Sequence, residues 1–318
     1  MSDLGIADLG ARLKDEVAKA IVGQDEAVEL LLIALFSRGH VLLEGPPGTA
    51  KTLLARSFSR SLDLSFSRIQ FTPDLMPGDI LGTNLFDFQS STFRLTKGPI
   101  FAEMLLADEI NRAPPKTQAA LLEAMQERQV TIDAETLKLS DHFMVIATQN
   151  PIESQGTYPL PEAQLDRFTF KHVLDYPDAE QEADIVRQSG ASMTESSALD
   201  KQISAVLTPG ALTEALGQIA NVKLSDDVAD YIVRLVRATR DAPSFSIGAS
   251  PRSGVLLARA VRARAGLHGR DYTIPDDVKA LALPTFRHRL ILSPAAEVEG
   301  QRVDDALSLI IEATDVPR

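Results

Sequence analysis

Eight consecutive residues have the types and spacing needed to bind the phosphates of a nucleotide. They read Gly45-Pro46-Pro47-Gly48-Thr49-Ala50-Lys51-Thr52. In such a loop, backbone N–H groups surround the β-phosphate at a helix N-terminus, where the helix dipole favours negative charge. The lysine contacts the β/γ oxygens, and the hydroxyl group of the last residue binds Mg²⁺. The loop therefore predicts ATP and Mg²⁺ as cofactors.

Ala50 stands where the pattern G-x-x-x-x-G-K-[ST] has its second glycine. Alanine adds only a methyl group, so we expect the turn to persist provided that Ala50 keeps a negative φ. The alternative interpretation is a Gly-Pro turn that precedes Lys-Thr by chance. The apolar run before the loop and the helical pattern after it favour phosphate binding.

Two carboxylates provide the chemical partner of this loop. The apolar run Met104–Asp108 ends in Asp108, and Glu109 follows it. At the end of a strand, one carboxylate can reach the metal and the other can reach a water molecule beside the γ-phosphate. We expect Asp108 to hold Mg²⁺ together with Thr52, and Glu109 to orient and deprotonate the attacking water.

The elements that must position these residues alternate between strands and helices. The expected strands are His40–Glu44, Arg68–Phe71, Met104–Asp108, Phe143–Thr148 and Phe168–Val173. The expected helices of this half are Ile6–Ala20, Glu26–Ser37, Thr52–Leu62 and Lys116–Glu127. Apolar strands that alternate with helices predict an α/β fold, a parallel sheet with helices on both faces.

Strand signals almost vanish after Tyr176-Pro177. The expected helices beyond this point are Ala179–Gln188, Pro209–Ile219, Ser225–Arg240, Ser253–Ala265 and Pro275–Leu283. The stretch 189–200 is rich in Ser and small polar residues and is the expected linker. We therefore predict an α/β domain over residues 1–175 and an all-helical domain over residues 176–318.

Composition limits the classes of function. The chain contains no cysteine, which excludes disulfides, thiolate metal sites and a cysteine nucleophile. Its 318 residues carry a net charge of −12, with 17 basic and 28 acidic residues in the first 194 and 15 and 16 in the rest. This balance disfavours nucleic acid and anionic membranes as partners. Neither a signal peptide nor an apolar run of roughly 20 residues is visible, so we expect a cytoplasmic protein without membrane insertion.

Several motifs in a fixed order resemble the MoxR family of AAA+ ATPases. They are the phosphate loop, ADEINRAP (107–114), RIQFTPDL (68–75), ATQNP (147–151) and LPEAQLDRF (160–168). The resemblance extends from about Ile21 to Ser293. It implies a P-loop AAA+ core with hairpin inserts, followed by a helical lid.

The resemblance also implies roles for further residues. Asn150 takes the position of sensor 1, where an amide can bind the attacking water or the γ-phosphate. Arg167 takes the position of the arginine finger that enters the neighbouring subunit's site, and Arg112 is a rival for that role. Arg252 resembles sensor 2, which would contact the γ-phosphate from the lid. Val22 and Gly23 resemble the segment that lines the adenine.

Two inserted segments are expected to form hairpins, Leu81–Ile100 and Val130–Leu139. In similar proteins such hairpins line the central face of a ring. The alternative interpretation is a pair of plain surface loops. Three aromatic side chains, Phe86, Phe88 and Phe93, disfavour this interpretation.

The implied function is that of a hexameric ring that hydrolyses Mg-ATP and remodels, matures or activates a protein client. The resemblance further implies partners with von Willebrand factor A domains and roles that include metal cofactor insertion. One alternative is a nucleic-acid-stimulated motor, which the mixed charges of the two hairpins and the acidic first half disfavour. Another is a slow nucleotide-gated binding module, against which intact Glu109, Asn150 and Arg167 argue.

Overall fold

The computed structural model describes residues 5–89, 91–151, 156–189 and 203–317. Its centre is a five-stranded sheet in the order β2-β5-β8-β1-β9, and every neighbouring pair is parallel. The strands are β1 (Val41–Glu44), β2 (Phe66–Gln70), β5 (Met104–Asp108), β8 (Met144–Gln149) and β9 (Phe170–Val173). The predicted parallel sheet is confirmed, with strand ends that differ by one or two residues from those expected.

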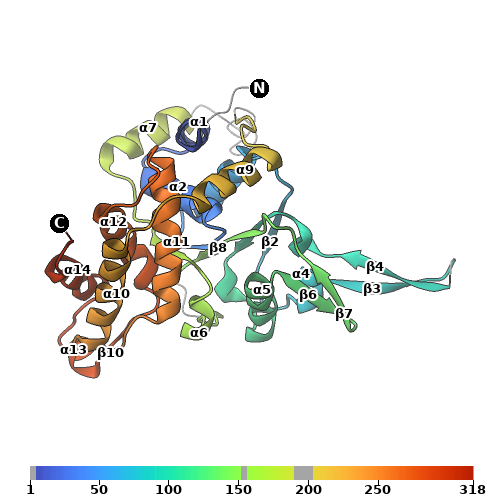
Figure 1. Cartoon of the computed structure of the whole chain (residues 1–318). Coiled ribbons are helices and arrows are strands. Elements are labelled where there is room, and N and C mark those ends of the chain that lie inside the picture. The colour runs from blue at the N-terminus through green and yellow to red at the C-terminus, as the bar shows by residue number, and fades with distance from the viewer. Residues whose placement is uncertain (1–4, 90, 152–155, 190–202, 318) are drawn as a thin grey trace.

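Helices cover both faces of this sheet (Figure 1). On one face, α1 (Ile6–Ala18), α2 (Asp25–Phe36) and α3 (Lys51–Arg60) form a buried cluster with alternate strand residues such as Leu106. On the other face, α4 (Pro77–Leu81) and α5 (Pro115–Glu127) pack with the intervening residues, such as Leu105. Side chains of a strand alternate between faces, so both faces of an apolar strand need such cover.

The C-terminal half is helical except for one small ribbon that the sequence did not predict. Its helices are α7 (Ala179–Ser189), α9 (Pro209–Ala220), α10 (Asp226–Asp241), α11 (Pro251–Leu267), α12 (Pro275–Phe286), α13 (Pro294–Val298) and α14 (Val303–Ala313). The ribbon pairs β10 (Phe245–Ile247) with β11 (Ile291–Leu292) in antiparallel fashion. Of the expected linker, residues 190–200 lie outside the described residues.

The helical lid and the N-terminal helices share one core. Buried residues of α1, α2 and α3 belong to the same cluster as those of α9 to α12. Gly10 of α1 lies so close to α11 that an added Cβ would be 2.6 Å from Leu267 Cδ2. The lid is therefore held against the α/β region by apolar packing as well as by the chain connection.

Both predicted hairpins are present. Strands β3 (Gly82–Asp87) and β4 (Thr92–Lys97) pair with each other and extend away from the rest of the molecule (Figure 1). Strands β6 (Gln129–Ile132) and β7 (Glu135–Lys138) turn at Asp133 and Ala134, whose positive φ angles of 47° and 70° suit a two-residue hairpin. Short elements complete the chain: η1 (Pro99–Phe101), η2 (Ile110–Arg112) and α6 (Glu162–Leu165). Within the described residues, no helix has the length and apolarity to span a membrane.

Candidate nucleotide-binding site

The phosphate loop connects the carboxyl end of β1 to the start of α3. The N–H of Gly45 donates to the carbonyl of Gln149 at 3.3 Å, which fixes the loop to β8. Gly48 has a φ of +85°, and an added Cβ would meet no atom within 4 Å. The backbone at Gly48 is therefore uncrowded, which leaves its N–H free to approach a phosphate.

Ala50 adopts a left-handed conformation, with a φ of 58° and a ψ of 21°. We expected a negative φ, so the structure corrects that expectation. The pattern has glycine here because glycine reaches this region without steric cost, whereas a Cβ costs roughly 1 kcal/mol. Ala50 thus keeps the backbone geometry of the glycine that it replaces and bears the strain.

Lys51, the first residue of α3, points back into the loop. Its Nζ donates to the carbonyl oxygens of Gly45 and Pro46, both at 2.6 Å. The loop is further held by the hydroxyl of Thr49, which donates to Pro46 O at 2.9 Å. A cationic group at the N-terminus of a helix is suited to an anionic ligand.

Thr52 and Asp108, the two predicted metal ligands, are in contact. The Thr52 hydroxyl lies 3.1 Å from both carboxylate oxygens of Asp108. A second hydroxyl, that of Thr148 on β8, donates to Asp108 Oδ1 at 2.6 Å. Hydroxyl and carboxylate oxygens are ligands that Mg²⁺ prefers, so these residues fit the expected ion.

Arg68 of β2 is a partner of Asp108 that sequence reasoning did not assign. Its Nη2 and Nε donate to Asp108 Oδ2 at 2.6 and 3.2 Å. Strand β2 lies beside β5 with Arg68 opposite Leu106, so the long side chain reaches the strand end. The sequence places Arg68 in the short segment RIQF but does not show that this strand lies beside β5, so the ion pair could not be predicted from it.

Glu109 is held by three groups of its own chain. Its N–H donates to Thr148 Oγ1 at 2.9 Å, and its Oε2 accepts a hydrogen bond from Gln70 Nε2 at 2.7 Å. The Arg112 guanidinium lies 3.2 Å from the same oxygen. Glu109 itself has a positive φ of 56°. Gln70 was also not assigned from the sequence.

The remaining predicted residues of this edge lie around the loop. Asn150 is buried directly after β8, and its carbonyl accepts a hydrogen bond from Asn111 Nδ2 at 3.3 Å. Val22 is half-buried and Gly23 exposed, and Gly23 lies close against the side chain of Gln181 on α7. Their expected roles toward the γ-phosphate and the adenine stay predictions.

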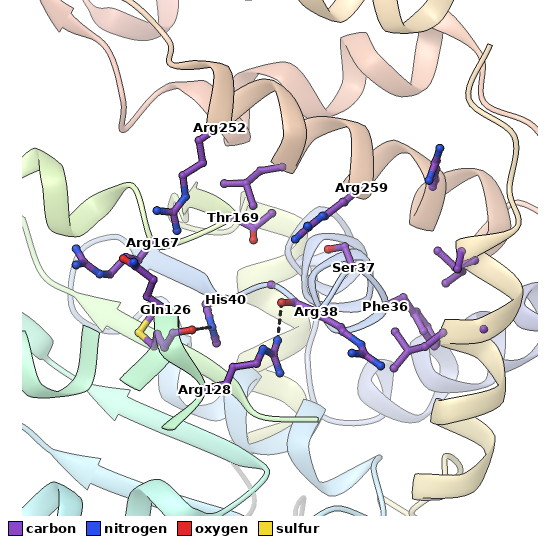
Figure 2. A pocket seen from close by; sticks show the side chains of 18 of the residues that line it. Phe36, Ser37, Arg38, His40, Gln126, Arg128, Arg167, Thr169, Arg252 and Arg259 are labelled. Atoms are coloured by element: carbon purple, nitrogen blue, oxygen red, sulfur yellow. Dashed lines mark hydrogen bonds between the residues drawn. The ribbon is translucent and has the colours of Figure 1, made fainter. Parts of the chain in front are cut away.

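Arg167 and Arg252 lie at the opposite end of the strands, beside the start of β1. Both line a pocket together with Gly39 and His40, which precede β1, whereas the phosphate loop follows β1 (Figure 2). Five residue steps at about 3.3 Å separate His40 from Gly45, or roughly 16 Å. Arg252 thus lies near the candidate finger and not near the loop of its own chain, and its expected role toward a γ-phosphate stays a prediction.

A buried arginine that the sequence did not single out holds the segment around Arg167. Arg289, whose side chain is 3% exposed, donates from Nε to Asp166 Oδ1 at 2.7 Å and from Nη2 to the carbonyls of Asp166 and Phe168 at 3.1 and 2.5 Å. Arg252 Nε lies 3.6 Å from the other Asp166 oxygen. Burial lowers the pKa of Arg289, and the hydrogen bond to Asp166 opposes that shift. The lid therefore holds the backbone on both sides of Arg167.

Comparisons with known proteins agree with this geometry. Residues 40–170 match the family described as "ATPase family associated with various cellular activities (AAA)", and residues 237–310 match the AAA lid domain. The chain is 44% identical over 312 residues to Chaperone MoxR1 of Mycobacterium tuberculosis, covering 95% of this chain and 81% of the relative. It is 33% identical over 336 residues to Protein MoxR of Methylorubrum extorquens, covering 98% and 96%. A crystal structure of a protein from Cytophaga hutchinsonii assigned as an ATPase superposes with a TM-score of 0.89 at 40% identity, covering 98% of this chain and 96% of that one.

Proposed function

This chain belongs to the MoxR family of AAA+ ATPases, and on that premise we propose that it hydrolyses Mg-ATP to remodel, mature or activate a protein partner. One observation carries the proposal: the Thr52 hydroxyl, at the end of the phosphate loop, lies 3.1 Å from both carboxylate oxygens of Asp108. Mg²⁺ supplies charge neutralisation between the phosphate oxygens when it is bound. Thr52 and Asp108 are the residues that would hold it.

Other residues of the chain would bind the phosphates, activate the water and orient the carboxylates. Lys51 brings a positive charge to the loop, and Glu109, beside the metal ligands, would take a proton from the attacking water. The Thr148 hydroxyl contacts both Asp108 and the backbone of Glu109, so it orients the two carboxylates relative to each other. Gln70 and Arg112 hold the Glu109 carboxylate in place until the nucleotide is bound.

A ring of subunits would complete the site. Arg112 pairs with Glu109 of its own chain, whereas Arg167 lies beside the amino end of β1, away from the phosphate loop. Arg167 therefore suits the role of a finger that acts on a neighbour's nucleotide, and Arg252 beside it would act on the same neighbour. This arrangement needs head-to-tail contacts between subunits that close into a ring. We propose that the ring is a homo-hexamer.

The long hairpin supports a protein client. Phe88 and Phe93 are 87% and 72% exposed, and Phe86 packs edge-to-face with each of them at 5.2 Å between ring centroids. An exposed aromatic cluster at a projecting hairpin suits apolar protein segments better than a phosphate backbone. The relative named Chaperone MoxR1 supports the same choice. Our proposal includes a von Willebrand factor A domain partner and a cytoplasmic location.

Turnover of ATP by the purified chain tests the proposed chemistry. Lys51→Ala is expected to abolish nucleotide binding, and Glu109→Gln is expected to lower kcat by about 10²- to 10⁴-fold while ATP still binds. Glu123→Gln, an exposed carboxylate of α5, serves as the matched control and should leave turnover unchanged. Unchanged hydrolysis in the Lys51→Ala and Glu109→Gln variants would refute the site.

A further inference from the structure

The pocket at the amino end of β1 is a large basic cavity. Its volume is about 700 Å³, within the range of small-molecule sites. Six arginines line it: Arg38, Arg128, Arg167, Arg252, Arg259 and Arg262. Among the described residues, no Asp or Glu belongs to the lining. In a chain of net charge −12, this concentration of positive charge requires an explanation.

The arginines form two groups along the pocket (Figure 2). Arg167 and Arg252 lie at one end, where Asp166 and the backbone hold them. Arg38, Arg128 and Arg259, together with Arg262 of the same pocket lining, which follows Arg259 by three residues on α11, form the second group, which we call the four-arginine end. Arg128 donates to the carbonyls of Arg38 and Asp141, both at 2.9 Å, so its side chain is fixed at the floor of this end.

Three of these four side chains have unused hydrogen-bonding capacity. The Arg262 Nε is buried without a partner in the described structure. Within the same described residues, neither Arg38 nor Arg259 has a side-chain hydrogen bond or ion pair. Arg259 and Arg262 are three residues apart on α11, which places them on one face of the helix. Each guanidinium carries five N–H donors, and those that face the cavity are available to a ligand.

The charge and the backbone geometry of these arginines are both unfavourable for the folded chain on its own. Burial lowers the pKa of Arg128 and the charges of Arg38 and Arg259 lower it further, while the charge of Asp141 opposes the shift. The arginines of this end therefore repel one another. Arg38 and Arg128 also have positive φ angles of 56° and 52° at the ends of α2 and α5. Glycine is usual at such positions, because a side chain there costs roughly 1 kcal/mol.

His40 does not add to this charge. Its ring is buried, with Nδ1 accepting the N–H of Val145 at 2.9 Å and Nε2 lying 3.3 Å from Met125 O. Burial and the charge of Arg128 lower the pKa of His40 to about 3. The histidine is therefore neutral at physiological pH, and the positive charge of the pocket comes from its arginines.

We propose that the four-arginine end is a binding site for an oligophosphate anion, separate from the phosphate loop of the same chain. Planar guanidinium groups bind phosphate oxygens in pairs, and several of them converging in a cavity match several linked phosphates. The phosphate loop lies roughly 16 Å away along β1, so one triphosphate cannot occupy both sites. The ligand could be a free oligophosphate or, resting on the proposed ring, the phosphate tail of a nucleotide on the adjacent subunit.

Titration of inorganic tripolyphosphate by calorimetry tests the site. The experiment uses the full chain with Lys51→Ala, which removes binding at the phosphate loop, in Mg²⁺-free buffer at 150 mM salt. Saturable binding of one anion per chain is expected. Arg259→Gln and Arg262→Gln should each weaken it about tenfold, because each removes one charge-assisted contact. Both act on incompletely buried side chains, so the fold should be kept, which melting curves will check.

The control is Arg302→Gln, which removes an exposed arginine before α14 and leaves the pocket intact. It should leave the affinity unchanged. Absence of saturable binding, or an equal loss with Arg302→Gln, would overturn the proposal. Wild-type chain should bind two anions, one at each site. A wild type with a single, Arg259-dependent site would refute the phosphate loop while leaving this site intact.

A second titration identifies the source of the phosphate. Mg-ATP binding is measured in Glu109→Gln rings with and without Arg259→Gln. If the pocket holds the tail of the neighbour's nucleotide, Arg259→Gln should weaken ATP binding about tenfold. If the ligand is a free oligophosphate, ATP binding should be the same in both. The tripolyphosphate titration decides whether the site exists, and this one assigns its ligand.

Discussion

At the carboxyl end of β1 the charged side chains have partners within the chain, whereas at its amino end several do not. Asp108 is contacted by Thr52, Thr148 and Arg68, and Glu109 by Gln70. At the four-arginine end, the Nε of Arg262 is buried without a partner in the described structure. A set of buried polar groups is stable only when its hydrogen bonds are made.

This difference indicates how the two regions work. At the carboxyl end the two carboxylates, Asp108 and Glu109, already have partners within the chain, so a metal ion or a nucleotide that binds them must replace existing contacts. The amino end has arginine side chains without a partner among the described residues, which leaves them able to bind an anion or a neighbouring subunit. Under the proposed function, one region would serve chemistry on the chain's own nucleotide, and the other would serve a contact from outside the chain.

Among the variants that test this comparison, Arg167→Ala is expected to have the largest effect. If the amino end acts only across a subunit boundary, ATP turnover should fall by about 10³-fold or more, as for other arginine fingers. ATP affinity of the phosphate loop should not change. Mixed with Glu109→Gln subunits, Arg167→Ala subunits should recover part of the activity, because some interfaces then contain both intact groups. Intact assembly without any recovery would contradict action in trans.

Arg289→Lys tests whether the lid positions Arg167. Lysine keeps the charge but cannot bind Asp166 and the carbonyls of Asp166 and Phe168 at once, so kcat should fall about tenfold. KM for ATP should stay the same because the loop is untouched. Arg270→Gln breaks a different lid ion pair, with Asp277, and controls for lost stability. A similar loss of kcat in both variants would indicate a general structural effect.

Arg68→Gln tests the contacts that hold Asp108 at the carboxyl end of the sheet. The guanidinium donates to Asp108 Oδ2 and competes with a metal ion for that oxygen. Removing it should lower the Mg²⁺ concentration needed for half-maximal turnover by about threefold to tenfold, in line with a partly exposed ion pair. A Mg²⁺ titration at saturating ATP measures this. A higher Mg²⁺ requirement would mean that Arg68 orients Asp108 for the metal.

Ala50→Gly is expected to have the smallest effect. Glycine removes the strain of a left-handed alanine, so the free energy of unfolding should rise by up to about 1 kcal/mol. Urea unfolding measures this change, and Ala55→Gly in the middle of α3 is the matched control, which should destabilise by about the same amount. Destabilisation by Ala50→Gly would show that the methyl group makes a packing contact.

Much of the fold and of the loop site could be predicted from the sequence. Strand β5 and its terminal acids were identified residue by residue, because a short apolar run ending in Asp-Glu is a local signal. The ribbon β10–β11 was missed, since a pair of strands of three and two residues has no detectable alternation. The place of Arg252 beside Arg167 could not be predicted, because nothing local to Ser250-Pro251-Arg252 tells at which end of the strands the lid places it.

The sequence by itself determined the chemistry that depends on neighbouring residues: a phosphate loop after a strand, two acids after another, and the strand and helix order that brings them to one edge. Only the tertiary structure decided the pairings between distant residues. Arg68 meets Asp108 because β2 lies beside β5, and Arg289 reaches Asp166 because α12 packs near β9. The arginine pocket depends on α2, α5 and α11 converging at one end of β1. Such convergence follows from packing many side chains into one core, which no local spacing encodes.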